Sequence, residues 1–193
     1  MIINWAENIR ALHNILETLS IGDQYGNILQ HNEGFERWKE ITFKARDADN
    51  TIFLVGNGAS ASMASHFSAD LSKTARIRTQ IFTDLSLITA CANDLCYEKV
   101  YAEPLSWSMK RDDMLIAISS SGNSPNIIRA IETAKSLGGI VVTLSAMQPD
   151  NAIRRMGDIN CYIPAETYGM AETCHAAVLH YWVDLFQIEM SGN

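Results

Sequence analysis

The chain has 193 residues, of which 47% are hydrophobic, and this suits one globular domain with a sizeable core. Its formal net charge of −7 gives no overall basic signal, so we expect no nucleic-acid partner. No basic leader opens the sequence, no apolar run approaches the ~20 residues that span a bilayer, and the four cysteines lack C-x-x-C spacing. We therefore expect a cytoplasmic protein with reduced thiols and no membrane partner.

Two amphipathic helices are predicted ahead of the first strand. Residues 3–20 and 33–46 each repeat apolar side chains at helical spacing, beginning with Trp5. Residues 1–48 are thus expected to be a helical N-terminal extension of a single domain that spans 1–193. The apolar face of this extension would pack either on the domain itself or on another subunit.

Short apolar runs alternate with helical patterns from residue 51 onward. The five runs expected to form strands are 51–56, 78–84, 113–119, 139–145 and 159–164. The helices expected after them span 60–72, 86–109, 125–137, 151–156 and 171–189. Pro104 predicts a break or kink in the second of these helices. This alternation indicates an α/β fold, with a parallel five-stranded sheet in a three-layer α/β/α sandwich joined by right-handed crossovers.

Two serine- and glycine-rich loops lie where the first and third expected strands end. They read GNGASAS at 56–62 and SSSGNSP at 119–125, and each leads into a helix. Ligands of such sheets bind at the carboxyl ends of strands, and the free N–H groups of a helix N-terminus attract an anion. One such run is also ordinary turn chemistry, but two of them favour a ligand. Serine hydroxyls without a lysine suit a phosphomonoester on a small sugar. Neither loop matches a nucleotide-binding motif, so we expect no nucleotide cofactor.

Three stretches carry a family resemblance: VGNGASASMASHFSADL, AISSSGNSPNIIRAIETAKSLG and AETCHAAVLHYWVDL. They resemble the sugar isomerase (SIS) domain family. Within it they are most similar to the phosphoheptose isomerase group, which interconverts sedoheptulose 7-phosphate and D-glycero-D-manno-heptose 7-phosphate. The resemblance covers most of the chain and implies a flavodoxin-like SIS domain that isomerises a phosphosugar through an enediol. It also implies a homotetramer whose active sites are built from neighbouring subunits, with the N-terminal helices in the interface.

The same resemblance assigns the substrate and phosphate contacts. They fall on Asn57, Ser60, Asp94, Ser119, Ser120, Ser121 and Ser124. Moving a proton between adjacent carbons also needs an acid, a base and a group that stabilises an oxyanion, and histidine and carboxylate side chains are the obvious types.

Four such side chains lie on two predicted helices. His66 and Asp70 are four residues apart and share a face, and Glu172 and His180 are eight apart, within ~80° around their helix. The resemblance makes Asp70 and His180 the catalytic pair, and in some members these four positions bind zinc. Two alternatives are therefore left open with equal weight: a Zn²⁺ ion held by all four side chains, or four groups that hydrogen-bond one another without a metal. His175, on the same helix, is expected to be a structural histidine with its hydrogen bonds satisfied.

Three positions depart from the isomerase pattern. Asp70 stands where the group has glutamate, Glu172 where it often has glutamine, and Gly169 where it has aspartate. The added carboxylate makes Glu172 a candidate replacement base.

Two other functions are weighed against the isomerase. One is a non-catalytic SIS adaptor that binds a protein partner such as the bacterial replication initiator, and the other is a phosphosugar sensor. The resemblance implies that the adaptor lacks the second histidine, so His180 favours an enzyme. The sensor ranks last because the N-terminal region is too short and too acidic for a DNA-binding domain.

Overall fold

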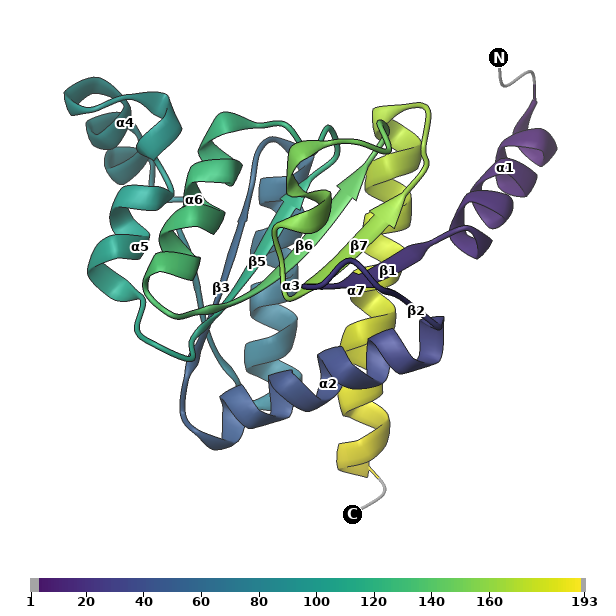
Figure 1. Ribbon diagram of the computed structural model, residues 1–193, viewed down its shortest axis with the longest axis horizontal. Coiled ribbons are helices and arrows are strands. Elements are labelled where there is room, and N and C mark those ends of the chain that lie inside the picture. Colours follow the sequence, from purple (N-terminus) through teal and green to yellow (C-terminus); the bar gives the residue numbers. More distant parts are fainter. Residues whose placement is uncertain (1–3, 192–193) are drawn as a thin grey trace.

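The computed structural model describes residues 4–191, which fold around one seven-stranded sheet (Figure 1). The sheet order is β2-β1-β7-β6-β5-β3-β4. The strands are β1 (Ser20–Asp23), β2 (Ile28–Leu29), β3 (Thr51–Gly56), β4 (Arg78–Ile81), β5 (Met114–Ser119), β6 (Ile140–Ala146) and β7 (Ile159–Ile163). The strands from β3 to β7 are parallel, as predicted, and β1 and β2 extend the sheet antiparallel beyond β7.

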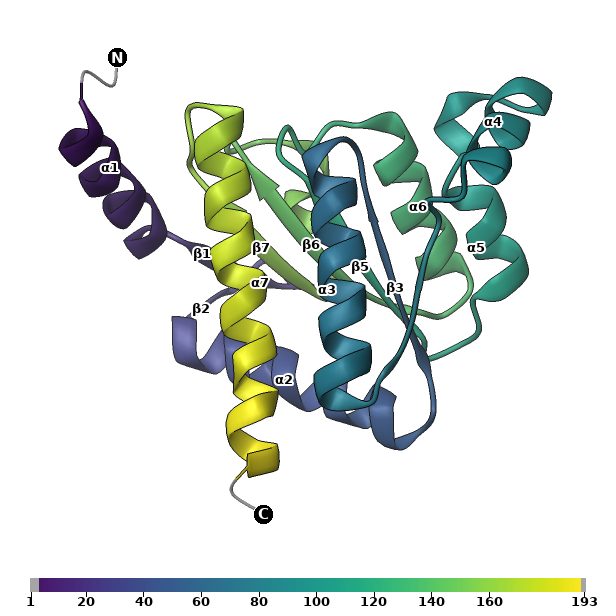
Figure 2. The ribbon, with the colours of Figure 1, turned by 180° about the vertical axis from the view of Figure 1, so that it is seen from behind.

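Helices cover both faces of the sheet and complete the expected three layers (Figures 1 and 2). One face packs against α2 (His31–Asp47), α3 (Ala59–Ala75) and α7 (Tyr168–Ser191). The other packs against α5 (Ala102–Ser108), α6 (Pro125–Ser136) and the short turns η1 (Tyr97–Lys99) and η2 (Ala152–Arg155), with α4 (Leu85–Asp94) outside them. The α/β/α class is thus confirmed, with two strands more than predicted.

The central strands β3 and β5 are apolar through their middle residues because helices cover both their faces. They are neighbours in the sheet, but the chain leaves them in opposite directions. From β3 it passes through α3 to the edge strand β4, and from β5 it passes through α6 to β6 on the other side. Loops that diverge in this way open a crevice at the switch point, where ligands of doubly wound sheets bind.

The N-terminal segment differs from the all-helical extension that the sequence predicted. Helix α1 (Trp5–Glu17) and α2 are present, but the hairpin β1–β2 lies between them and joins the sheet through β7. The Asp23 carboxylate accepts hydrogen bonds from the N–H groups of Tyr25 and Asn27, which closes the turn. The strands were missed because they have only 4 and 2 residues. The Gly26–Asn27 pair between apolar residues was the available hairpin signal.

Two helix boundaries also differ from the prediction. The helix expected at 86–109 is divided into α4 and α5, and the break falls at residues 95–101, ahead of Pro104. The proline lies in the first turn of α5, where its missing N–H costs little. Helix α7 begins at Tyr168, three residues before the expected start at Ala171. No helix within residues 4–191 combines the length and apolarity needed to cross a bilayer.

Candidate active site

A pocket of about 160 Å³ opens at the switch point between β3 and β5. Its lining combines the two serine-rich loops with the start of α7, through Asn57, Ser60, Ile118, Ser119, Ser120, Ser121, Ser124, Tyr168 and Glu172. Helices α3 and α6 both begin at these loops. The structure therefore brings Asn57 and all five predicted serines together beside two helix N-termini, where an anion is stabilised.

The serine hydroxyls are arranged so that several stay available to a ligand. Ser124 is the N-cap of α6 but makes no side-chain capping bond, because its hydroxyl lies 3.2 Å from that of Ser119. Ser60 and Ser119 are buried at 5% and 4% exposure, so their hydroxyls meet little bulk water. Hydroxyl donors in such a dry, concave place suit the oxygens of a phosphate group.

The serine loop is supported from behind by the segment between β6 and η2. Gly122 adopts a φ of +65°, and a Cβ there would come within 2.0 Å of Oδ1 of Asn151. The N–H of Ile153 donates to the Gly122 carbonyl, and the N–H of Ala152 donates to Oδ1 of Asn123. Only glycine fits both the backbone angle and the space at position 122.

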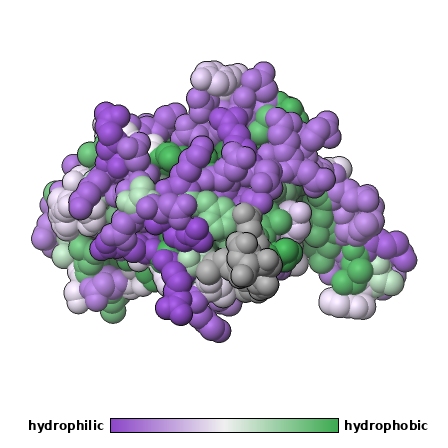
Figure 3. Space-filling view, turned by 90° about the horizontal axis from the view of Figure 1, so that it is seen from below, coloured by the Kyte–Doolittle hydropathy of each residue, from purple (hydrophilic) through white to green (hydrophobic). Residues whose placement is uncertain are grey.

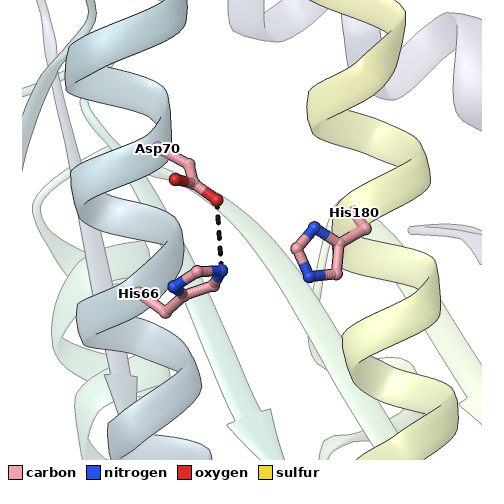
Figure 4. Close-up of side chains that lie close together, drawn as sticks. All are labelled: His66, Asp70 and His180. Atoms are coloured by element: carbon pink, nitrogen blue, oxygen red, sulfur yellow. Dashed lines mark ion pairs between the residues drawn. The ribbon is translucent and has the colours of Figure 1, made fainter.

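A second group of polar side chains lies on α3 and α7, away from the serine loops (Figure 4). His66 Nε2 is 3.2 Å from Asp70 Oδ2, one turn further along α3. His180 faces them from α7, with its ring 5.4 Å from that of His66. One ligand atom from each of the three lies within 4.8 Å of the others. We call these three residues the His-Asp-His cluster, and both of its histidines are exposed.

Glu172 is not part of the His-Asp-His cluster, which corrects the expected four-residue set for a single chain. Eight residues bring Glu172 and His180 to similar angles on α7, but the helix also rises about 12 Å over that distance. Glu172 therefore lines the serine pocket, and His180 lies two turns below. The four-residue set was wrong because a similar angle around the helix does not bring two residues together when the rise along the helix separates them.

Asp94 does not line the serine pocket within this chain. It is exposed at the end of α4, where its carboxylate accepts a hydrogen bond from Asn93 Nδ2. Tyr168 and Ile118 line the pocket without having been predicted. Ile118 was assigned only to the strand core, and Tyr168 was missed because the last helix begins before its expected start.

His175 lies in the core beneath this region and is wholly buried. Among the described residues, neither ring nitrogen has a partner in good hydrogen-bond geometry, and the Ser145 backbone is the one polar neighbour that acts on the ring. The expectation that its hydrogen bonds are satisfied is therefore not confirmed. Burial lowers the pKa of His175 to about 4, and the nearby Ser145 backbone opposes this shift only in part. His175 is therefore neutral near pH 7, and it belongs to neither the serine pocket nor the His-Asp-His cluster.

Comparison with known proteins agrees with this geometry. A family model described as the SIS domain matches residues 26–146, which is more than half of the chain. The chain belongs to the SIS domain family. Phosphoheptose isomerases of Helicobacter pylori (strain Shi470) and Aliarcobacter butzleri are 32% and 31% identical to it over 82% of its length, and the matches cover 91% and 87% of those proteins. The solved phosphoheptose isomerase of Neisseria gonorrhoeae has a TM-score of 0.80 and 26% identity, with 94% of each chain covered.

The His-Asp-His cluster of this SIS domain fits a divalent metal. Two imidazoles and one carboxylate, with an exposed fourth side, form the three-ligand arrangement typical of catalytic zinc sites. The serine pocket offers hydroxyl donors and a single carboxylate, which suits an anion better than a metal. The two groups can thus do different work, one holding a phosphate and the other a cation.

Proposed function

We propose that this chain is a phosphosugar aldose–ketose isomerase that interconverts sedoheptulose 7-phosphate and D-glycero-D-manno-heptose 7-phosphate. The serine pocket between two helix N-termini carries this proposal, because it suits a phosphomonoester. The relatives described above are named phosphoheptose isomerases, and they match most of the chain. This supports an enzyme over the adaptor.

The serine loops hold the phosphate, and charged side chains move the protons. In the ketose-to-aldose direction a proton leaves C1 and one is delivered to C2, while a hydroxyl proton passes from O1 to O2. Glu172 is the base for the carbon-bound proton, because it lines the same pocket as the serines. Asp70 is less suited to that step, since His66 already engages its carboxylate at 3.2 Å.

The complete site is assembled from neighbouring subunits of a homotetramer. Within one chain the serine pocket and the His-Asp-His cluster are about two helical turns apart along α7, and both open to solvent. A second subunit can therefore bring its cluster against the pocket of the first. That arrangement would unite Glu172 with the cluster of its neighbour, as the isomerase resemblance implies.

The His-Asp-His cluster is the proposed zinc site. Its three side chains would hold the ion, which when bound would polarise the substrate carbonyl and stabilise the enediolate. In the metal-free alternative Asp70 and His180 act directly as an acid–base pair. The cytoplasm is the proposed location, and the four cysteines are free, as thiols are there.

Isomerase activity is tested by NMR with sedoheptulose 7-phosphate and shorter phosphoketoses in D₂O. We expect conversion of the heptose and deuterium uptake from solvent at the carbon that loses its proton. Ser124→Ala should raise KM, whereas Glu172→Gln should abolish deuterium uptake. Binding of the sugar without conversion or deuterium uptake would favour a non-catalytic SIS protein instead.

The metal is tested by elemental analysis of protein purified without a histidine tag. We expect one zinc per chain, lost in Asp70→Asn and in His180→Gln. Glu166→Gln is the matched control and should keep its zinc, because Glu166 is exposed and lies outside both the cluster and the serine pocket. Substoichiometric metal in the wild type, with activity unaffected by a chelator, would reject zinc.

A further inference from the structure

The side chains of Asn57 and Asn126 form a reciprocal amide pair behind the serine pocket. Nδ2 of Asn57 donates to Oδ1 of Asn126 at 2.9 Å, and Nδ2 of Asn126 donates to Oδ1 of Asn57 at 2.8 Å. Asn57 lies in the loop after β3, and Asn126 is the second residue of α6, after the serine loop. The pair therefore connects the two halves of the pocket, which are 69 residues apart in the sequence.

Asn126 is 2% exposed and is not among the residues that line the pocket. An amide buried to this degree must be hydrogen-bonded, and the pair meets that need for both partners at once. Asn57 lines the pocket, but the pair occupies its Oδ1 and one of its two amide N–H groups. Its predicted contact with substrate is thus limited to what the second N–H and the backbone can supply.

Two tyrosines tie the loop after β3 to the η1–α5 segment. The Tyr97 hydroxyl donates to Oδ1 of Asn57 at 3.4 Å, and the buried Tyr101 hydroxyl donates to the carbonyl of Gly56. Within residues 4–191, the amide pair is the only side-chain hydrogen-bonded link between this loop and α6. A shift of one loop relative to the other would move Ser60 away from Ser119 and Ser124.

We propose that Asn126 is a positioning residue of the phosphate site. Through Asn57 it holds the N-termini of α3 and α6 at the separation at which serines of both loops reach one phosphate group. This inference rests on the proposed phosphate-binding function of the pocket. It assigns Asn126 no contact with the substrate and no part in proton transfer.

The test compares Asn126→Ala with Asn160→Ala, using inorganic phosphate as the probe. Asn160 is the matched control because it is 3% exposed and bonds Thr143 and Gly157, away from the pocket. Asn126→Ala should raise the inhibition constant of phosphate and the KM of the sugar phosphate together, roughly tenfold, the scale of one lost hydrogen bond. Its kcat should stay within about twofold, because the acid–base groups are untouched. Asn160→Ala should lower Tm and leave both binding constants unchanged.

Several outcomes would overturn the inference. One is a phosphate constant that Asn126→Ala leaves unchanged, and another is an equal change in both variants. If Asn126→Ala does not fold, Asn126→Ser, which keeps a hydroxyl but cannot span the pair, takes its place with the same expectation. Phosphate binding is also measured directly by calorimetry. If Asn126→Ala weakens that binding in a protein that isomerises no sugar, the positioning role of Asn126 stands and the proposed isomerase activity is rejected. Wild-type protein that binds no phosphate would reject both.

Discussion

Glu172 places a negative charge in a pocket that otherwise suits an anion. The other polar lining residues are neutral, namely Asn57, Tyr168 and the five serines. A carboxylate there would repel the phosphate that the hydroxyls and helix N-termini are proposed to hold. The proposed base chemistry gives this carboxylate a role that a neutral amide cannot fill.

Replacing Glu172 by glutamine should therefore change binding and catalysis in opposite directions. Removing one like charge near a protein surface is worth on the order of 1 kcal/mol, so phosphate should bind about fivefold more tightly. Loss of a general base should lower kcat by about a hundredfold or more. Phosphate inhibition and steady-state kinetics measure both effects. Glu166→Gln, at an exposed position outside the pocket, is the control, and weaker phosphate binding in Glu172→Gln would contradict this account.

At the residue scale, the sequence predicted the residues of the serine pocket better than those of the His-Asp-His cluster. Residues that directly follow β3 and β5 must meet at one edge of the sheet, so Asn57 and the serines were found together. Their role in binding stays a prediction. The positions of Asp94 and Glu172 relative to the two sites depend on how α4 and α7 pack in space. Neither a sequence motif nor the angle between two residues on a helix gives that information.

Helix α7 carries the buried His175 between Glu172 and His180. Because burial lowers the folded-state pKa from 6.5 to about 4, the unfolded chain binds one more proton than the folded chain between these values. Stability therefore rises with pH across this interval and is lost as the pH falls through it. Over about 2.5 pH units the loss reaches about 3 kcal/mol.

His175→Leu should remove this acid sensitivity. Above pH 7 the variant should be at least as stable as the wild type, because a buried imidazole without a well-formed hydrogen bond is costly to hold in the core. Near pH 4 it should be more stable by about 3 kcal/mol. Urea unfolding from pH 4 to pH 8 measures the difference. Parallel curves for wild type and His175→Leu would contradict a buried neutral histidine.

At the element scale, burial on both faces made the strands easy to predict. β3, β5, β6 and β7 are short, mainly apolar runs between turn residues, and all were expected. The hairpin was missed because two short strands on a sheet edge give little periodicity. The division of the helix at 86–109 depends on tertiary contacts, such as that of Tyr101 with Gly56, which propensity does not reveal.

Helix α1 projects from one end of the molecule (Figures 1 and 2). It has no buried residue, and Trp5 and Ile9 are 75% and 45% exposed. The view from below also shows hydrophobic side chains at the end where α1 lies (Figure 3). Ala11, Leu12, Ile15 and Leu16 pack partly against the core, but the face with Trp5 and Ile9 stays open. An amphipathic helix gains most of its stability by packing, and one chain alone provides only part of that packing.

The proposed tetramer supplies the missing contact, so charges on α1 should dissociate it. Wild-type protein should run near four times its chain mass of 21.4 kDa in light scattering. Trp5→Glu combined with Ile9→Glu should give a smaller species, because a carboxylate buried without a partner is costly. Trp107→Glu is the matched control, since Trp107 is 64% exposed on α5, far along the chain from α1.

Activity should follow assembly if each site joins the pocket of one subunit to the His-Asp-His cluster of another. The α1 variant should lose isomerase activity on dilution and regain it at higher protein concentration, because association is a mass-action equilibrium. Phosphate should still bind to the dissociated chains, since the serine pocket lies within one chain. This separates loss of catalysis from loss of folding. A monomer that isomerises as fast as the wild type would mean that one chain bridges the two helical turns between Glu172 and His180 by itself.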